Sequence, residues 1–136
     1  MHFELDPRLA ADTHHVIAWP LCDVRLMDDA QYPWLILVPR IAGSRELIDL
    51  DLGARIRLQQ EIDGAAQVLK QMFAPDKLNV AALGNVVEQL HVHVIARFRH
   101  DAAWPKPVWG VHPPTRRSED ERAGLIGRLQ AALQPD

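Results

Sequence analysis

The sequence predicts an α+β domain in which an antiparallel sheet of about five strands carries one long helix and a C-terminal helix. Several short apolar runs are bounded by turn residues, a pattern that is typical of strands. Helical spacing of apolar residues is found over residues 50–74 and again after Ser118. Because the strands are separated by only one long helix, an antiparallel sheet is favoured over a parallel one.

Composition indicates a single domain, residues 1–136, and argues against several classes of protein. Apolar residues make up 48% and the net charge is −3, so neither nucleic acid nor an anionic membrane is an expected partner. No run reaches the roughly 20 apolar residues of a membrane helix, and the acidic start MHFELDPRLAAD is unlike a signal peptide. The single cysteine, Cys22, cannot form a disulfide within the chain and fits a reducing cytoplasm.

The first part of the chain predicts a short helix and the first strands. Asp6-Pro7 is a cap followed by proline, so we expect a short helix over residues 6–11. His15–Leu26 predicts a strand that is broken or bulged near Pro20. After a turn at 28–31, the continuous apolar run 34–38 predicts a strand covered on both faces.

The second part predicts two helices, two strands and an irregular loop. Strands are expected over 78–83 and 90–98, and the prolines within 104–114 predict an ordered but irregular loop. The capping-box pattern Ser118–Glu121 opens the last helix. Apolar stripes run along both helices: Leu58, Ile62, Ala65, Leu69 and Met72 in the long one, which Pro75 ends, and Leu125, Ile126, Leu129 and Leu133 in the last.

The stretch EQLHVHVIAR, in a strand of about 89–98, carries the functional signal. Side chains alternate along a strand, so Gln89, His91 and His93 are expected on one face, about 6.6 Å apart. The usual residues of a solvated face (Lys, Glu, Thr) are missing from this row, which disfavours a plain solvent face. The other face is apolar and is expected to meet the core: Leu90, Val92 and Val94.

A metal site is a weaker interpretation of the same two histidines. Histidines two apart on a strand can ligate zinc or copper, but a third ligand is needed. Neither CxxC nor HExxH is present, and the other candidate histidines are scattered along the chain, so we expect no metal. These candidates are His14, His15, His100 and His112.

Nucleophilic attack at phosphorus explains the row best. A neutral imidazole is a good nucleophile near pH 7, and its product with a phosphate is a phosphoramidate that water can cleave. A second histidine nearby can hydrogen-bond the phosphate or the leaving group, which is typically worth about 10²–10⁴ in rate.

QLHVHVIAR resembles the signature of the histidine triad (HIT) family, His-φ-His-φ-His-φ-φ with φ apolar, with Gln89 at the first histidine position. The segment VRLMDDAQYPWLILVPR is similar to that family's strand–turn–strand, and AWPKPVWG to the tail of its purine nucleoside phosphoramidase branch. The match looks closest to a bacterial subgroup with Gln-φ-His-φ-His. The resemblance covers residues 13–112 and implies a HIT-like fold and a homodimer.

The resemblance also implies roles for individual residues. His91 attacks the α-phosphate of a purine nucleotide derivative and carries the nucleotidyl group, while His93 contacts the phosphate or leaving group. Asp28 or Asp29 binds the ribose hydroxyls. Asn85, with Asn79 as a weaker alternative, reaches the phosphate. No cofactor is implied, and the substrate is a dinucleoside polyphosphate, a nucleoside phosphoramidate or an aminoacyl-adenylate.

Two departures from the family pattern leave an alternative open. Gln89 can exchange hydrogen bonds but cannot shuttle a proton. Trp34 stands where many members have a histidine, and we expect it to donate poorly to the site and to narrow a pocket or pack into the core. The alternative function is therefore a catalytically weak nucleotide-binding or regulatory module. Two arginines that continue the histidine row, Arg97 and Arg99, either line a phosphate channel or are solvated.

Overall fold

An open antiparallel sheet of five strands, in the order β1-β2-β3-β5-β4, organises the chain, as predicted. The computed structural model describes residues 2–135. The strands are β1 (Thr13–Ala18), β2 (Cys22–Met27), β3 (Trp34–Pro39), β4 (Lys77–Ala81) and β5 (Val92–Arg97). The helices are α1 (Pro7–Asp12), α2 (Leu52–Phe73), α3 (Glu119–Leu133) and the short 3₁₀ turn η1 (Leu47–Asp49). None of the helices within residues 2–135 has the length and apolarity to cross a membrane.

The N-terminal elements form where local chemistry directs them. The Asp6 carboxylate accepts the Arg8 amide at 2.8 Å and caps α1, as expected from Asp6-Pro7. The expected strand with a break near Pro20 is an antiparallel hairpin, β1–β2, that turns at this proline. The β1–β2 register shifts between His15 and Ile17, which bends the strand at the sheet edge.

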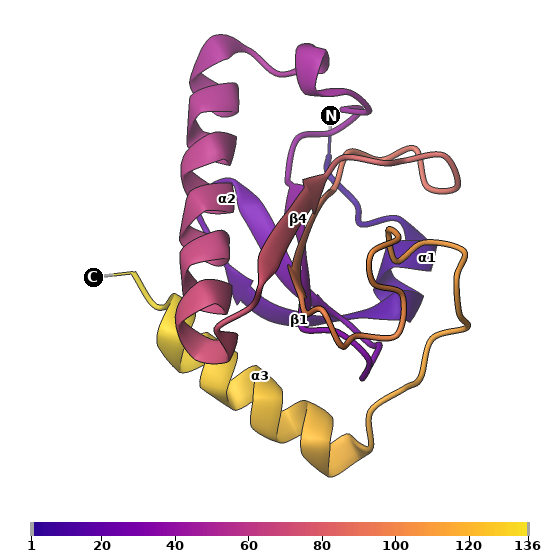
Figure 1. Cartoon of the computed structure of the whole chain (residues 1–136). Helices are drawn as coiled ribbons and strands as arrows, with labels where there is room; N and C mark the ends of the chain where they lie inside the picture. Colours follow the sequence, from indigo (N-terminus) through magenta and orange to yellow (C-terminus); the bar gives the residue numbers. More distant parts are fainter. Residues whose placement is uncertain (1, 136) are drawn as a thin grey trace.

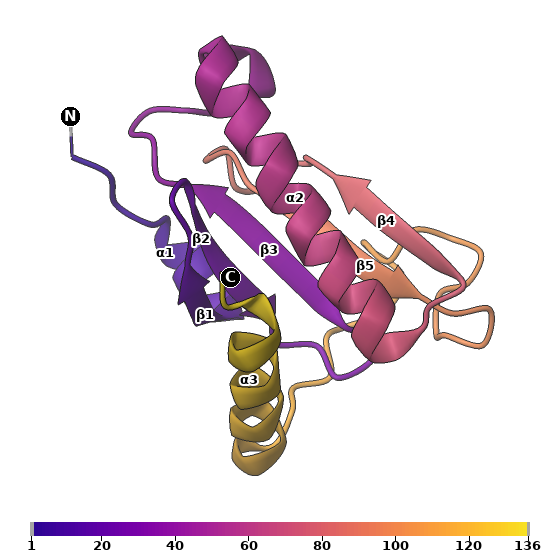
Figure 2. The same cartoon turned by 90° about the vertical axis from the view of Figure 1, so that its left-hand side faces the viewer.

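Both long helices cover one face of the sheet (Figures 1 and 2). The Asp51 carboxylate caps α2 by accepting the Ala54 amide at 2.8 Å, and Ala74 ends the helix in the left-handed conformation. Ser118 caps α3, as its sequence pattern predicts. The predicted stripes are largely confirmed, since these residues are buried: Leu58, Ile62, Ala65 and Leu69 in α2, and Leu125, Leu129 and Leu133 in α3.

The opposite face of the sheet carries a second, smaller core beneath α1 and the 99–117 segment (Figure 1). Every residue of β3 is buried, which confirms the prediction of a strand covered on both faces. Alternate residues of β3 enter the two cores, so Leu35 and Leu37 face the long helices while Trp34, Ile36 and Val38 face the smaller core.

The histidine strand is shorter than predicted. β5 begins at Val92 rather than at residue 89 or 90, because its ladder with β3 ends at the Leu37–Val92 pair and its ladder with β4 ends at Ala81–His93. Ahead of it, the Leu90 amide donates to the Ser44 carbonyl at 3.0 Å instead of to a neighbouring strand. The predicted apolar face is confirmed, because Leu90, Val92 and Val94 all lie in the core under α2.

Candidate active site

His91 lies just before β5, and its ring orientation is set by the main chain. Its Nδ1 is 2.7 Å from the backbone carbonyl oxygen of Gln89. A carbonyl oxygen can only accept, so Nδ1 carries a proton, and in the tautomer that this selects the lone pair is on Nε2. The His91 residue is 6% exposed and lines a cavity. The local backbone therefore selects the tautomer in which Nε2 is the nitrogen that can act as a nucleophile, on a residue in the wall of that cavity.

His93 stands beside His91, with the two ring centroids 5.0 Å apart. The indole N–H of Trp34 donates to its Nδ1 at 3.0 Å. An indole nitrogen cannot accept, so Nδ1 of His93 is unprotonated and its proton sits on Nε2. Burial, together with the nearby His91, lowers the pKa of His93 to about 3. His93 is therefore neutral at physiological pH.

Aromatic rings surround His93 on the face of the sheet away from the long helices. The ring centroids of Trp109 and His93 are 5.1 Å apart, and the two ring planes meet nearly edge-on at 75°. The centroid of the Trp34 ring lies 5.6 Å from that of His93 and 6.1 Å from that of Trp109. The expectation that Trp34 packs into the core is confirmed, whereas the expectation that it donates poorly to the site is wrong, since its indole N–H donates to His93.

Two adjoining cavities open in front of the histidines. The inner one, of about 280 Å³, contains both histidines in its wall, and the outer one, of about 460 Å³, reaches Asp28 and Asp29. Together they have the size of pockets that hold small-molecule ligands. The two cavities share six residues: Asp12, Met27, Leu83, Asn85, Val86 and Trp109.

Gln89 does not direct its side chain between the two histidines. Its Oε1 accepts the Asp6 amide and its Nε2 donates to the Glu4 carbonyl, both at 2.8 Å. The side chain also lines a third cavity of about 460 Å³. The expected alternation stops short of Gln89 because residues 89–91 precede the regular strand. The backbone carbonyl of Gln89 thus orients His91, while its side chain binds the N-terminal segment.

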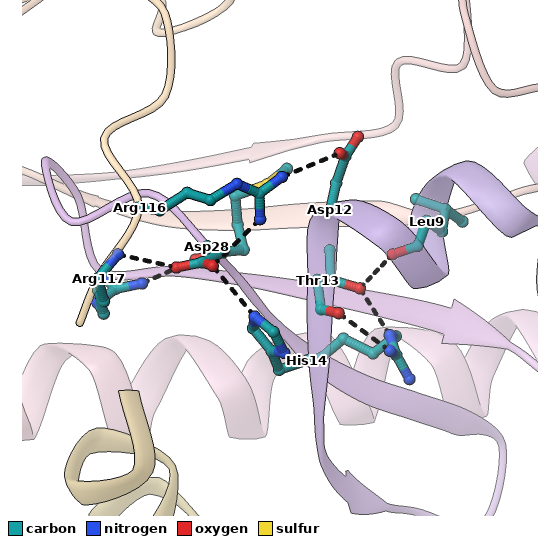
Figure 3. A network of polar contacts seen from close by, with 9 residues as sticks. Leu9, Asp12, Thr13, His14, Asp28, Arg116 and Arg117 are labelled. Carbon is teal, nitrogen blue, oxygen red and sulfur yellow. Dashed lines mark hydrogen bonds and ion pairs between the residues drawn. The ribbon is translucent and has the colours of Figure 1, made fainter. Parts of the chain in front are cut away.

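Asp28 is the centre of a polar network that ties the start of α3 to the sheet (Figure 3). Its carboxylate accepts from His14 Nε2 at 3.1 Å, from Arg116 at 3.2 Å and from the Arg117 amide at 3.1 Å. Burial acts to raise the pKa of Asp28, but these hydrogen bonds outweigh it and the net pKa is below the ordinary value. Asp28 is therefore an anchored carboxylate in the wall of the outer cavity.

Asp29 uses only one of its two carboxylate oxygens in hydrogen bonds among residues 2–135. Its Oδ1 accepts from the amide and side chain of Gln31 at 3.1 Å and from the Thr115 amide at 3.3 Å. The side chain lies in the wall of the outer cavity beside Asp28. The second oxygen, Oδ2, is left as a possible acceptor for a ligand.

The two candidate amides are placed differently. Asn85 is exposed and lines the inner cavity together with His91 and His93. Asn79, the weaker alternative, accepts a hydrogen bond from Arg97 at 2.8 Å and lies in none of the cavities around the histidines. The structure thus brings Asn85, and not Asn79, to the histidines.

The arginines that continue the histidine row form no phosphate channel. Arg97 is 2% exposed, and its guanidinium binds both oxygens of Asp101 at 2.7 and 3.1 Å as well as the Lys106 carbonyl. Both expectations for Arg97 are wrong, because the loop after β5 folds back over it. Arg99 is exposed, as the solvated alternative has it.

His14, His15, His100 and His112 do not join His91 and His93 in the wall of the inner cavity. His14 and His15 bind Asp28 and Asp23, and His112 lies in the wall of the outer cavity with its Nε2 2.9 Å from the Ala102 carbonyl. Across residues 2–135, no group of three or more His, Cys, Asp or Glu side chains is arranged to hold a metal ion.

Comparison with known proteins identifies the family of the chain. The model of the HIT domain family matches residues 8–100. The chain belongs to the HIT family. HIT proteins are nucleotide-binding hydrolases and transferases.

Solved HIT structures share the whole fold. A histidine triad protein from Bradyrhizobium japonicum is 45% identical, with 98% of this chain and 100% of that one covered and a TM-score of 0.95. One from Marinobacter aquaeolei is 47% identical over 98% and 97% of the two chains, with a TM-score of 0.95. One from Sinorhizobium meliloti is 41% identical over 96% of each, with a TM-score of 0.93. No curated protein gave a significant match.

Sequence reasoning missed the part that Trp34 plays in the site. The residue was visible as a donor-only side chain in a buried strand, which is a reason to look for its acceptor. What the sequence did not contain is the register, which pairs Trp34 with Ile95 and Ile36 with His93 and so sets the indole beside the histidine.

Proposed function

We propose that this HIT protein is a nucleotide hydrolase or nucleotidyl transferase that acts on purine nucleoside phosphate derivatives through a nucleotidyl-His91 intermediate. The observation that carries the proposal is the hydrogen bond from His91 Nδ1 to the Gln89 carbonyl. It leaves the Nε2 lone pair available for in-line attack on an α-phosphate. A reducing cytoplasm suits this chain, whose one cysteine, Cys22, is buried.

The two adjoining cavities support separate binding places for the phosphate and the nucleoside of the substrate. The α-phosphate fits the inner cavity, within reach of His91, His93 and the Asn85 amide. The nucleoside fits the larger outer cavity, where Asp28 and Asp29 provide carboxylates. Asp29 is the better acceptor for a ribose hydroxyl, because Asp28 is already bound by His14, Arg116 and the Arg117 amide.

Turnover by matched variants tests the proposal. Wild type is expected to cleave diadenosine tetraphosphate or adenosine phosphoramidate, and His91→Ala is expected to lose at least 10³-fold in kcat, as for removal of a nucleophile. His15→Ala is the control, since His15 lies on β1 and binds Asp23 outside the cavities. Mass spectrometry of quenched wild-type reactions should detect a nucleotidyl group on His91. Equal rates for wild type and His91→Ala would refute the mechanism.

A nucleotide-binding module with little turnover is the second candidate. The observation that favours it is the engagement of the Gln89 amide with the backbone of Glu4 and Asp6, which gives the site no titratable group at this position. This candidate expects micromolar binding of AMP or GMP by calorimetry together with negligible turnover of both substrates. Turnover that depends on His91 would exclude it.

A homodimer is also proposed, with β4 as the contact edge. β4 is an outer strand of the sheet, and an open strand edge offers backbone hydrogen bonds to another copy. The large apolar side chains that are exposed come from two stretches of the chain. One stretch is β4 and the segment after it, and the other is η1 and the start of α2. These residues are Val80, Leu83, Val86, Leu47, Ile48, Leu52 and Ile56. Such a patch is typical of an interface.

A further inference from the structure

The contact between Trp34 and His93 restricts the chemistry of His93. The indole N–H points at Nδ1 from 3.0 Å, and an indole nitrogen can only donate. A proton on Nδ1 would set two N–H groups against each other and break this hydrogen bond. The Trp34 indole therefore selects the form of His93 that has its proton on Nε2 alone.

The surroundings of His93 reinforce this selection. Trp34 and His93 are 6% and 4% exposed, so the hydrogen bond between them is largely shielded from bulk water and costly to lose. The neighbours across the sheet, Ile36 on β3 and Ala81 on β4, are apolar. The titratable groups that share the inner cavity with His93 are His91, from the same segment, and Asp12, from the end of α1.

We propose that Trp34 is a positioning residue, whose indole N–H holds His93 as a neutral Nε2–H donor, so that the site favours nucleotides whose leaving group departs without a proton from His93. This inference rests on the proposed function for its chemical consequence, although the state of His93 itself does not depend on it. In this role His93 donates a hydrogen bond to a phosphate oxygen as negative charge develops there.

The step balances without an acid. The Nε2 lone pair of His91 forms a bond to the α-phosphorus, the bond from phosphorus to the leaving oxygen breaks, and that oxygen leaves with the electron pair as an anion. In the nucleotidyl-His91 cation the proton stays on Nδ1, which donates its hydrogen bond to the Gln89 carbonyl. Water then attacks phosphorus and breaks the P–N bond, which restores neutral His91 and releases the nucleoside monophosphate and one proton to solvent.

A preference among substrate classes follows. Phosphate and carboxylate are stable anions, so phosphoanhydrides and acyl-phosphates of nucleosides suit this site. An amine must be protonated to leave phosphorus readily, and a neutral His93 with its proton held on Nε2 is a weak acid. Within the proposed function, we therefore place dinucleoside polyphosphates and acyl-nucleotides ahead of nucleoside phosphoramidates.

The state of His93 can be measured without substrate by ¹⁵N NMR of the imidazole rings. Wild type is expected to show protonated Nε2 and hydrogen-bonded, unprotonated Nδ1 at pH 7. Trp34→Phe keeps an aromatic ring but removes the donor, so the His93 Nδ1 resonance should move towards that of an unpaired imidazole nitrogen. Trp109→Phe is the matched control for this signal, because Trp109 packs on His93 without a hydrogen bond to it. A protonated Nδ1 in wild type, or no shift in Trp34→Phe, would overturn the inference.

Kinetics with AMP aryl esters test the chemical consequence. The 4-nitrophenyl and phenyl esters share a nucleotide but differ in the acidity of the leaving phenol. For wild type we expect kcat to be at least tenfold higher with the 4-nitrophenyl ester. For Trp34→Phe we expect about a tenfold lower kcat with KM within twofold. Equal kcat for the two esters, or for the two proteins, would overturn the inference. If neither ester is cleaved, the proposed function fails while the NMR result still decides the state of His93.

Discussion

The side-chain amide of Gln89 binds the backbone amide of Asp6, 83 positions earlier in the chain, at 2.8 Å. The same side chain donates to the Glu4 carbonyl, so it forms hydrogen bonds to the N-terminal segment in both directions. Asp6 caps α1, and α1 carries Leu9 and Asp12 into the wall of the inner cavity. A residue at the first position of the triad pattern thus fixes one wall of the candidate site.

Gln89→Ala is expected to loosen that wall. The two hydrogen bonds contribute about 0.5–1.5 kcal/mol each, so the free energy of unfolding should fall by roughly 1–3 kcal/mol. Amide hydrogen exchange should become faster for residues 4–9 while the core strands stay protected.

The neighbouring Glu88→Gln variant is a suitable control for Gln89→Ala. Glu88 is exposed, and its ion pair with Arg45 at 3.1 Å lies on the surface, where such pairs contribute about 0–1 kcal/mol. Unchanged exchange at residues 4–9 in Gln89→Ala would show that the amide does not hold the N-terminal segment.

Asp28→Asn is expected to release the segment that leads into α3. The depressed pKa of Asp28 means that its ionised form stabilises the folded state, and an amide cannot accept equally from His14, Arg116 and the Arg117 backbone. In wild type this contribution is present above the unfolded pKa of about 3.9 and is lost as pH falls through the lower folded pKa. The variant should therefore lose stability at pH 7 and show a weaker fall of stability in acid.

Urea unfolding between pH 2 and pH 7 measures this difference. Asp63→Asn is the matched control, because Asp63 is an exposed residue of α2 whose carboxylate accepts from Gln59 at 2.8 Å on the surface of the helix. Parallel pH curves for wild type and Asp28→Asn would contradict the role assigned to the Asp28 carboxylate.

Asp101→Asn should be more damaging, because it leaves Arg97 charged and buried. Burial acts to raise the pKa of Asp101, but the hydrogen bonds from Arg97 and the Phe98 and Trp104 amides bring it down to about 2. Breaking a buried ion pair from one side costs about 3–5 kcal/mol. A thermal melt should show a loss far larger than that of Asp63→Asn, and a loss below about 1 kcal/mol would mean that the pair is dispensable.

Much of the fold was predictable because its signals are local. Caps at Asp6 and Ser118, the apolar stripes of α2 and α3, and the doubly apolar run of β3 each follow from neighbouring residues. The alternation around the histidines also placed Leu90, Val92 and Val94 in the core. Local patterns do not show where strand pairing stops. The prediction therefore began this strand too early and ended it too late, since β5 spans Val92–Arg97.

The site residues depend on contacts between distant parts of the chain, which alternation cannot supply. The partner of Gln89 lies 83 positions away, and the partner of Trp34 lies 59 positions away. Arg97 has the same parity as the histidines, but the loop that follows β5 brings Asp101 over it and removes it from the site. Parity thus selects a face of the sheet, and the loops decide which residues on that face reach a ligand.

Val80→Lys is expected to dissociate the proposed homodimer. Val80 is 48% exposed on β4, and a lysine at an edge strand opposes pairing with a second copy because like charges meet across a two-fold axis. Ala131→Lys is the control, since it adds the same charge at an exposed position of α3, a helix that packs against β1 at the other edge of the sheet. Sedimentation velocity should give dimers for wild type and Ala131→Lys and monomers for Val80→Lys. Monomers in wild type at micromolar concentration, or dimers in Val80→Lys, would rule out β4 as the contact edge.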